Sequence, residues 1–161
     1  MNKSLLVFMI LAILICGCSN NSDSADQPEP KYIGYVVQQE GNRILVTHYD
    51  EQSELNDAIW IRTKKNIALG QKVSIELDGG IETSYPAQAS AKNIDIIKTE
   101  QPETSRLTQQ EVIIRTLDHF NTIGLPFVKS IHYSEAKNVW TVVMLDGQSD
   151  VVEDMEFTIE G

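Results

Sequence analysis

The chain has 161 residues, of which 42% are hydrophobic, and its formal net charge at pH 7 is −10. This length and hydrophobic content predict a folded body, either one ordinary domain or two small ones. The acidic balance disfavours nucleic-acid binding, because a negative surface repels phosphate, whereas cationic partners remain compatible with it.

The first seventeen residues are typical of a bacterial export signal. Asn2-Lys3 provides the positive start, and twelve apolar or small residues run without interruption from Leu5 to Cys16. A helix that spans a membrane needs about 20 apolar residues, so this run is too short to remain as a membrane span. We therefore expect residues 1–17 to be removed as a signal peptide.

The cleavage region is similar to the bacterial lipobox. Ile15-Cys16-Gly17-Cys18 has an aliphatic residue, two small residues and then the cysteine that receives lipid. We expect Cys18 to become the lipidated N-terminus, which would hold the protein at the outer face of the cell membrane. The alternative is an ordinary secreted protein with an incidental cysteine. Lipidation of Cys18 would leave no free thiol for a disulfide or a cysteine metal site.

Residues 18–30 are predicted to form a tether, because they are acidic and rich in proline and contain no large apolar side chain. From residue 31 to residue 99 the pattern changes to short runs of β-forming residues, and Gly41-Asn42 suits a hairpin turn between the first two. The runs occupy residues 32–37, 44–47, 58–61, 73–77 and 94–97. They favour a five-stranded OB-like barrel, with a small open sheet or a sandwich as the alternative.

A second unit is predicted over residues 104–161. Thr108 and Glu111 match a helix capping box, and a helix should follow from residue 109 to residue 121. Three antiparallel strands are expected after it, at residues 127–133, 139–145 and 155–159. The predicted fold is therefore mainly β with one helix (α+β). This unit is too small for a good core unless it packs on the barrel or on a partner.

Two aromatic residues are predicted to be buried. Trp60 lies between Ile59 and Ile61 in an expected central strand, and Phe120 completes the apolar stripe of the helix. Truncating either side chain should therefore cost several kcal/mol, about 3–5 kcal/mol for a large aromatic side chain.

Three segments of the barrel region carry a family resemblance. Residues 67–73, 78–81 and 84–89 resemble the YobA-like family of small Gram-positive lipoproteins, over roughly residues 31–98. The domain of that family has no assigned function. The resemblance therefore implies a lipoprotein but indicates no catalytic residue.

The string Ser84-Tyr85-Pro86-Ala87-Gln88-Ala89 is the most distinctive part of that resemblance. Pro86 fixes a bend that could place Tyr85 and Gln88 on one side of a loop, where they would form a binding surface. In the interpretation that we favour, Tyr85 closes the end of the barrel and Gln88 satisfies backbone groups, since aromatic residues near turns usually pack.

The sequence contains no recognisable catalytic or cofactor motif. His48, His119 and His132 lack metal-ligand spacing, and no nucleophile elbow, phosphate-binding loop or dinucleotide fingerprint occurs, so no metal or cofactor is expected. The acidic residues of 146–154 could bind Ca²⁺, although their order is not that of an EF-hand and a solvated hairpin is the simpler interpretation.

These observations predict a non-enzymatic binding or interaction module of the cell envelope, with an unknown protein or envelope ligand as its partner. One alternative is an envelope hydrolase that pairs Asp95 or Asp118 with Glu153 as acid and base. Another is an inhibitor or chaperone-like arm that binds a secreted protein through a strand edge.

Overall fold

The computed structural model describes residues 31–99, 101–120, 124–149 and 153–161. The expected signal peptide, the tether and Cys18 lie outside these residues. In the part of the chain that is described, no helix combines the length and the hydrophobicity needed to cross a membrane.

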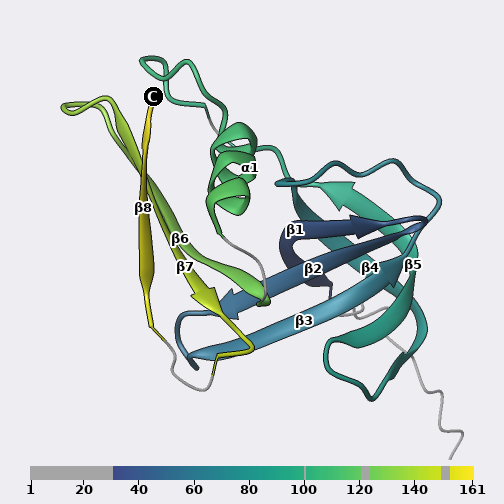
Figure 1. The fold of residues 1–161 in the computed structure, drawn as a ribbon. Helices are drawn as coiled ribbons and strands as arrows, with labels where there is room; N and C mark the ends of the chain where they lie inside the picture. Colours follow the sequence, from purple (N-terminus) through teal and green to yellow (C-terminus); the bar gives the residue numbers. More distant parts are fainter. Residues whose placement is uncertain (1–30, 100, 121–123, 150–152) are drawn as a thin grey trace, which may run out of the picture.

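The first five strands form a closed barrel (Figure 1). They are β1 (Tyr32–Glu40), β2 (Arg43–Asp50), β3 (Leu55–Arg62), β4 (Lys72–Glu82) and β5 (Ala87–Ile96). Their order around the barrel is β1-β2-β3-β5-β4, with β3 parallel to β5 and every other pair antiparallel. The predicted five-stranded OB-like barrel is confirmed, and the open sheet is excluded because β1 also pairs with β4.

Alternation along the strands gives the closed sheet an apolar interior. Inward-pointing β-branched and other aliphatic side chains fill the interior, among them Val36, Val46, Ile61, Val73 and Ile75, all fully buried. Closure gives every strand two neighbours and so removes the exposed edges that an open sheet would leave.

The second unit begins with α1 (Gln109–His119) and continues with β6 (Pro126–Ser134), β7 (Val139–Asp146) and β8 (Met155–Glu160). The capping box is confirmed: the Thr108 side chain accepts from the backbone N–H of Glu111, whose carboxylate accepts from the backbone N–H of Thr108. The helix ends two residues earlier than predicted, at His119. The three strands form an antiparallel sheet in the order β6-β7-β8, as expected.

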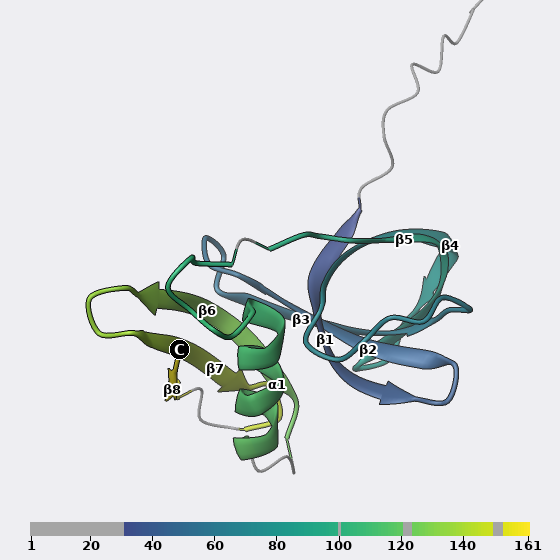
Figure 2. The same ribbon diagram turned by 90° about the horizontal axis from the view of Figure 1, so that it is seen from above.

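The second unit packs against the outer face of the barrel (Figures 1 and 2). One hydrophobic cluster joins Val37, Leu45 and Ala58 of the barrel to residues of α1 and of the three-stranded sheet, including the fully buried Phe127. The barrel is therefore the surface that this small unit needs in order to bury its apolar side chains.

The two aromatic residues predicted to be buried differ in outcome. Phe120 is 5% exposed, as predicted. Trp60 is only half-buried, so that prediction is wrong. The reason is the alternation of β3: Ile59 and Ile61 point into the barrel, and Trp60 points to its outer face. There the Arg43 guanidinium lies 4.8 Å from the centre of the Trp60 ring.

Candidate functional site

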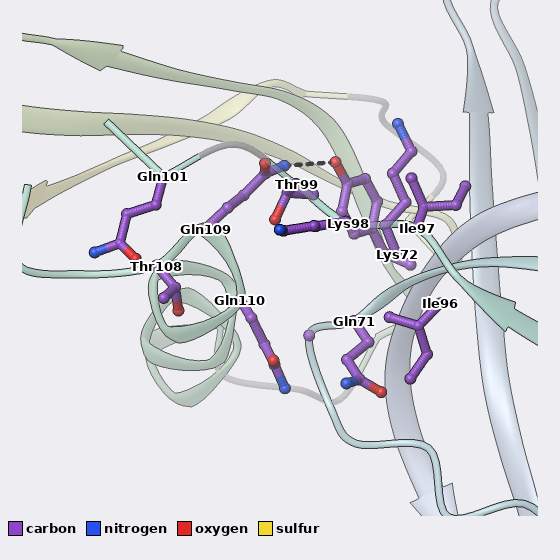
Figure 3. Close-up of a pocket in the computed structure, with 12 residues that line it drawn as sticks. Gln71, Lys72, Ile96, Ile97, Lys98, Thr99, Gln101, Thr108, Gln109 and Gln110 are labelled. Carbon is purple, nitrogen blue, oxygen red and sulfur yellow. Dashed lines mark hydrogen bonds between the residues drawn. The ribbon is translucent and has the colours of Figure 1, made fainter. Parts of the chain in front are cut away.

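A cleft of about 800 Å³ lies between the barrel and the start of α1 (Figure 3). Four parts of the chain form it: Tyr35 of β1, the start of β4 with the loop before it, the end of β5 with the segment after it, and the start of α1. The lining residues are Tyr35, Gly70, Gln71, Lys72, Ile96, Ile97, Lys98, Thr99, Gln101, Thr108, Gln109 and Gln110.

Two side-chain hydrogen bonds fix the start of α1 to the barrel and so set the width of the cleft. Gln109 Nε2 donates to the Tyr35 hydroxyl oxygen at 2.8 Å, and Gln110 Nε2 donates to the Leu69 carbonyl oxygen at 2.9 Å. Both donors belong to the turn that the capping box stabilises. The capping box at the start of α1 therefore also helps to fix the positions of two side chains in the cleft.

Gly70 allows the barrel to approach the helix closely. Its φ is +76°, and a Cβ placed there would lie 2.7 Å from the Gln110 carbonyl oxygen and 3.1 Å from Ile114 Cγ1. Only glycine adopts this conformation without strain and also leaves this space free.

Replacing Gly70 by alanine should therefore lower the free energy of unfolding by more than the conformational cost of a left-handed residue, which is about 1–2 kcal/mol. Gly79→Ala is the matched control, because Gly79 has a φ of +77° and nothing within 4 Å of the added Cβ. Urea unfolding of both variants measures the difference. Equal losses would contradict a close contact between Gly70 and α1.

Amide and hydroxyl groups dominate the polar lining of the cleft. Gln71 Oε1 accepts from the Ala68 backbone N–H at 2.8 Å, and Gln101 Nε2 donates to the Ser105 carbonyl oxygen at 3.3 Å. Each of the four lining glutamines uses one amide atom in such a bond. The other amide atom of each has no partner among the described residues. A fixed amide with one open atom suits a ligand that bears hydroxyl groups, since it can donate or accept.

Two lysines supply the charge of the cleft. Lys72 and Lys98 are the only charged side chains among the described lining residues, and neither has a carboxylate within 4 Å among the residues described. Lys72 Nζ lies 5.3 Å from the centre of the Tyr35 ring. Burial raises the pKa of Tyr35 above the usual tyrosine value. Glu100, which follows Thr99 in the chain, lies outside the described residues.

Tyr85 does not close the barrel. It lies in the turn between β4 and β5 and is 58% exposed, so the packing interpretation is wrong for this residue. Tyr32 takes that position instead: its ring packs against the interior cluster, and its hydroxyl donates to the Asp57 carbonyl oxygen at 2.9 Å. Burial raises the pKa of Tyr32 well above the usual tyrosine value.

Gln88 lies in β5, so its predicted position in a loop is wrong, whereas its role in binding stays a prediction. Its cross-strand neighbours are Trp60 of β3 and Glu82 of β4. It lines a small groove with Trp60, whereas Tyr85 does not line that groove. The strand begins at Ala87 because the backbone from this residue onward pairs with β3. The pattern of hydrophobic residues in the sequence does not predict this pairing.

The proposed hydrolase carboxylates have other contacts. Asp95 pairs with Lys31 at 3.3 Å, and the hydrogen bond from Lys31 lowers the pKa of Asp95. A lowered pKa opposes the role of general acid. Asp118 is exposed on α1, and Glu153 lines a different cavity together with His119 and Asp146.

Asp146 has a structural role in the acidic stretch considered for Ca²⁺. Its Oδ1 accepts from the backbone N–H groups of Leu125 and Gln148, both at 2.9 Å. Within the four described segments, no three His, Cys, Asp or Glu side chains come together as metal ligands could. Asp150 lies outside those segments.

Comparison with known protein families gives a match in the barrel region. Residues 33–98 match a family model described as a protein of unknown function (DUF3221). No curated protein matches the chain, and no solved structure matches it. The family match ends before α1, so it covers the barrel side of the cleft and not the helix side.

Proposed function

We propose that this chain is a non-enzymatic binding module of the cell envelope, and that the cleft between the barrel and α1 binds a small ligand that carries both hydroxyl groups and an anionic group. The observation that carries the proposal is the lining of the cleft. Lys72 and Lys98 supply positive charge without a described carboxylate partner, beside glutamine amides held in place by hydrogen bonds to the barrel and the linker.

Two further features support a binding role over catalysis. The described lining of the cleft contains no carboxylate, imidazole or thiol that could act as a base or nucleophile. Its amides are held by side-chain to backbone and side-chain to side-chain bonds. Such pre-organised donors favour binding, because little side-chain entropy is lost when the ligand enters.

The lipobox-like motif supports a location at the outer face of the membrane. In this proposal the protein is a lipoprotein similar to the YobA-like family, anchored through Cys18 and held by the tether of residues 18–30. The cleft would then meet ligands from the envelope or the medium.

Glucuronate is a suitable probe, because it combines hydroxyl groups with one carboxylate. The full chain in detergent micelles should bind glucuronate in a calorimetric titration. Lys72→Gln and Lys98→Gln should each weaken this binding about 10-fold or more, because a hydrogen bond to a charged group contributes about 1.5–3 kcal/mol. Glucose, which lacks the carboxylate, should bind more weakly and should respond little to either substitution.

Lys137→Gln is the matched control, since Lys137 is exposed in the turn between β6 and β7 and does not line the cleft. It should leave glucuronate binding unchanged. The proposed ligand class would be wrong if glucuronate did not bind, or if Lys137→Gln weakened its binding as much as the two cleft substitutions did.

A further inference from the structure

A second concave surface lies on the outer face of the barrel and shares no lining residue with the cleft. A ladder of cross-strand neighbours crosses it: Arg43 of β2 is opposite Arg62 of β3, and Arg62 is opposite Ser90 of β5. Like charges directly opposite each other lower the stability of a sheet. Two arginines opposite each other therefore do not stabilise the fold, which suggests that they serve another role.

The two arginines differ in how their charge is offset. Arg43 forms an ion pair with Glu40 and lies over the Trp60 ring. Arg62 has only the Ser90 hydroxyl oxygen, which accepts from its Nη1 at 3.5 Å, and no carboxylate within 4 Å among the residues described. The guanidinium of Arg62 is thus available to an anion from outside.

Three adjoining cavities, of about 80, 410 and 410 Å³, extend this surface around the β1–β2 turn. They share lining residues with one another, including Arg62 and Asn42. The bases that line them, here called the basic groove, are Arg43, Arg62, Lys64, Lys65 and Lys92, and the acids that line them are Asp78 and Glu82. A chain with only 13 Lys and Arg against 23 Asp and Glu therefore places five of its bases in one groove.

Neighbouring contacts hold part of the basic groove in place. Lys65 Nζ donates to Asn93 Oδ1 at 2.8 Å and to the Ile94 carbonyl oxygen at 2.6 Å. Lys92 pairs with Glu76. Lys64 is exposed and, like Arg62, has no carboxylate within 4 Å in the described parts of the chain. Arg62 and Lys64 thus form an unneutralised pair beside bases whose positions are fixed.

The net negative charge of the chain does not prevent an anion from binding here. At physiological ionic strength, interactions between exposed charges are largely screened beyond about 8 Å. The bases of the groove therefore attract an anionic ligand that touches them. The distant carboxylates repel it only weakly.

We propose that the basic groove binds a linear polymer that carries a phosphate in each repeating unit. Arginine and lysine side chains that line adjoining cavities can contact successive phosphates along one chain, and the planar guanidinium of Arg62 can donate two parallel hydrogen bonds to one of them. Asn42, Thr63 and Ser90 line the same cavities and supply neutral donors.

The position of the groove favours a soluble polymer over lipid headgroups. β1 runs from Tyr32 to Glu40, so the groove beside Gly41 and Asn42 lies at the end of β1 opposite to the one that the tether would enter. Nine strand residues span about 30 Å at 3.3 Å per residue. This step rests on the proposed anchor at Cys18, whereas the binding of phosphate in the groove does not.

Short-chain inorganic polyphosphate is the probe that tests this inference, with the full chain in detergent micelles and calorimetry at two salt concentrations. Polyphosphate should bind, and its affinity should fall as salt rises, because phosphate contacts displace counterions. Arg62→Gln combined with Lys64→Gln should weaken binding at least tenfold. Lys64→Gln alone, at an exposed position, should weaken it by a smaller factor without changing the melting temperature.

Reciprocal controls separate this site from the cleft. Lys72→Gln combined with Lys98→Gln should leave polyphosphate binding unchanged, and Arg62→Gln combined with Lys64→Gln should leave glucuronate binding unchanged. The inference is overturned if polyphosphate does not bind, or if the cleft variant weakens its binding as much as the groove variant. Binding to phosphatidylglycerol vesicles but not to polyphosphate would overturn it in favour of a membrane surface.

Discussion

Cys18→Ala is expected to block lipidation, and either to release the protein or to leave it as the unprocessed precursor. Because Cys16 should leave with residues 1–17, Cys18 has the only thiol of the expected mature chain, and this thiol can take a diacylglyceryl group as a thioether. Without that thiol no lipid chain is attached, and each buried CH₂ of such a chain contributes about 0.8 kcal/mol to membrane binding. Detergent phase partition and the mass of the mature protein measure the effect directly.

Cys16→Ala is the matched control for this experiment. Cys16 occupies a small-residue position of the same motif and should leave with the signal peptide, so alanine should be accepted there and lipidation should continue. A Cys18→Ala protein that kept its mobility and its partition into detergent would show that the chain is not a lipoprotein.

Phe127→Ala is expected to lower the free energy of unfolding by about 3–5 kcal/mol. The Phe127 side chain is fully buried in the hydrophobic cluster that joins the second unit to the barrel. Its removal leaves a cavity in that cluster, and typical domains are stable by only about 5–15 kcal/mol in total. Phe157, half-buried in β8, is the control residue, and its truncation should cost less.

Urea unfolding followed by tryptophan fluorescence and by circular dichroism distinguishes the outcomes. Because the cluster spans both parts, the two probes should report one transition at a lower urea concentration in Phe127→Ala. A variant within about 1 kcal/mol of the wild type, or a wild type that unfolds in two separate transitions, would contradict the shared core.

Most of the barrel could be predicted from the sequence because its strands contain short runs of β-forming residues and Gly41 marks the turn between β1 and β2. Four of the five predicted runs lie within the strands, although the strands extend beyond them by up to five residues, as β4 does at its end. The predicted fifth run starts at residue 94, whereas β5 already begins at Ala87. Its first half contains alanine, serine, glutamine and lysine, which give no hydrophobic signal, and its place in the sheet comes from pairing with β3 and β4.

The orientation of Trp60 could not be read from its surroundings. Residues 58–61 are all apolar because Ile59 and Ile61 fill the barrel while Ala58 packs beneath the second unit. A strand covered on both faces has no alternation to indicate which face is the interior. The same ambiguity applies to the tyrosines, since nothing in the local pattern distinguishes Tyr32, which enters the barrel, from Tyr85, which stays exposed.

The cleft was not predicted, although one of its parts was. The capping box located the first turn of α1, which carries Gln109 and Gln110. Their partners lie 74 and 41 residues earlier in the chain, so only the closed barrel and the packing of the second unit bring them together. Lys72 and Lys98 gave no signal in the sequence, because single lysines at strand ends are common on solvated surfaces.

We propose that the cleft between the barrel and α1 is the site where this protein binds a small anionic ligand. An NMR titration of the full chain with glucuronate tests it most directly, because backbone amide shifts report where the ligand lies. We expect saturable shifts concentrated at Gln71, Lys98 and Gln109, all of which line the cleft. Shifts that gather instead around Arg43 and Arg62, or no shift at saturating glucuronate, would contradict it.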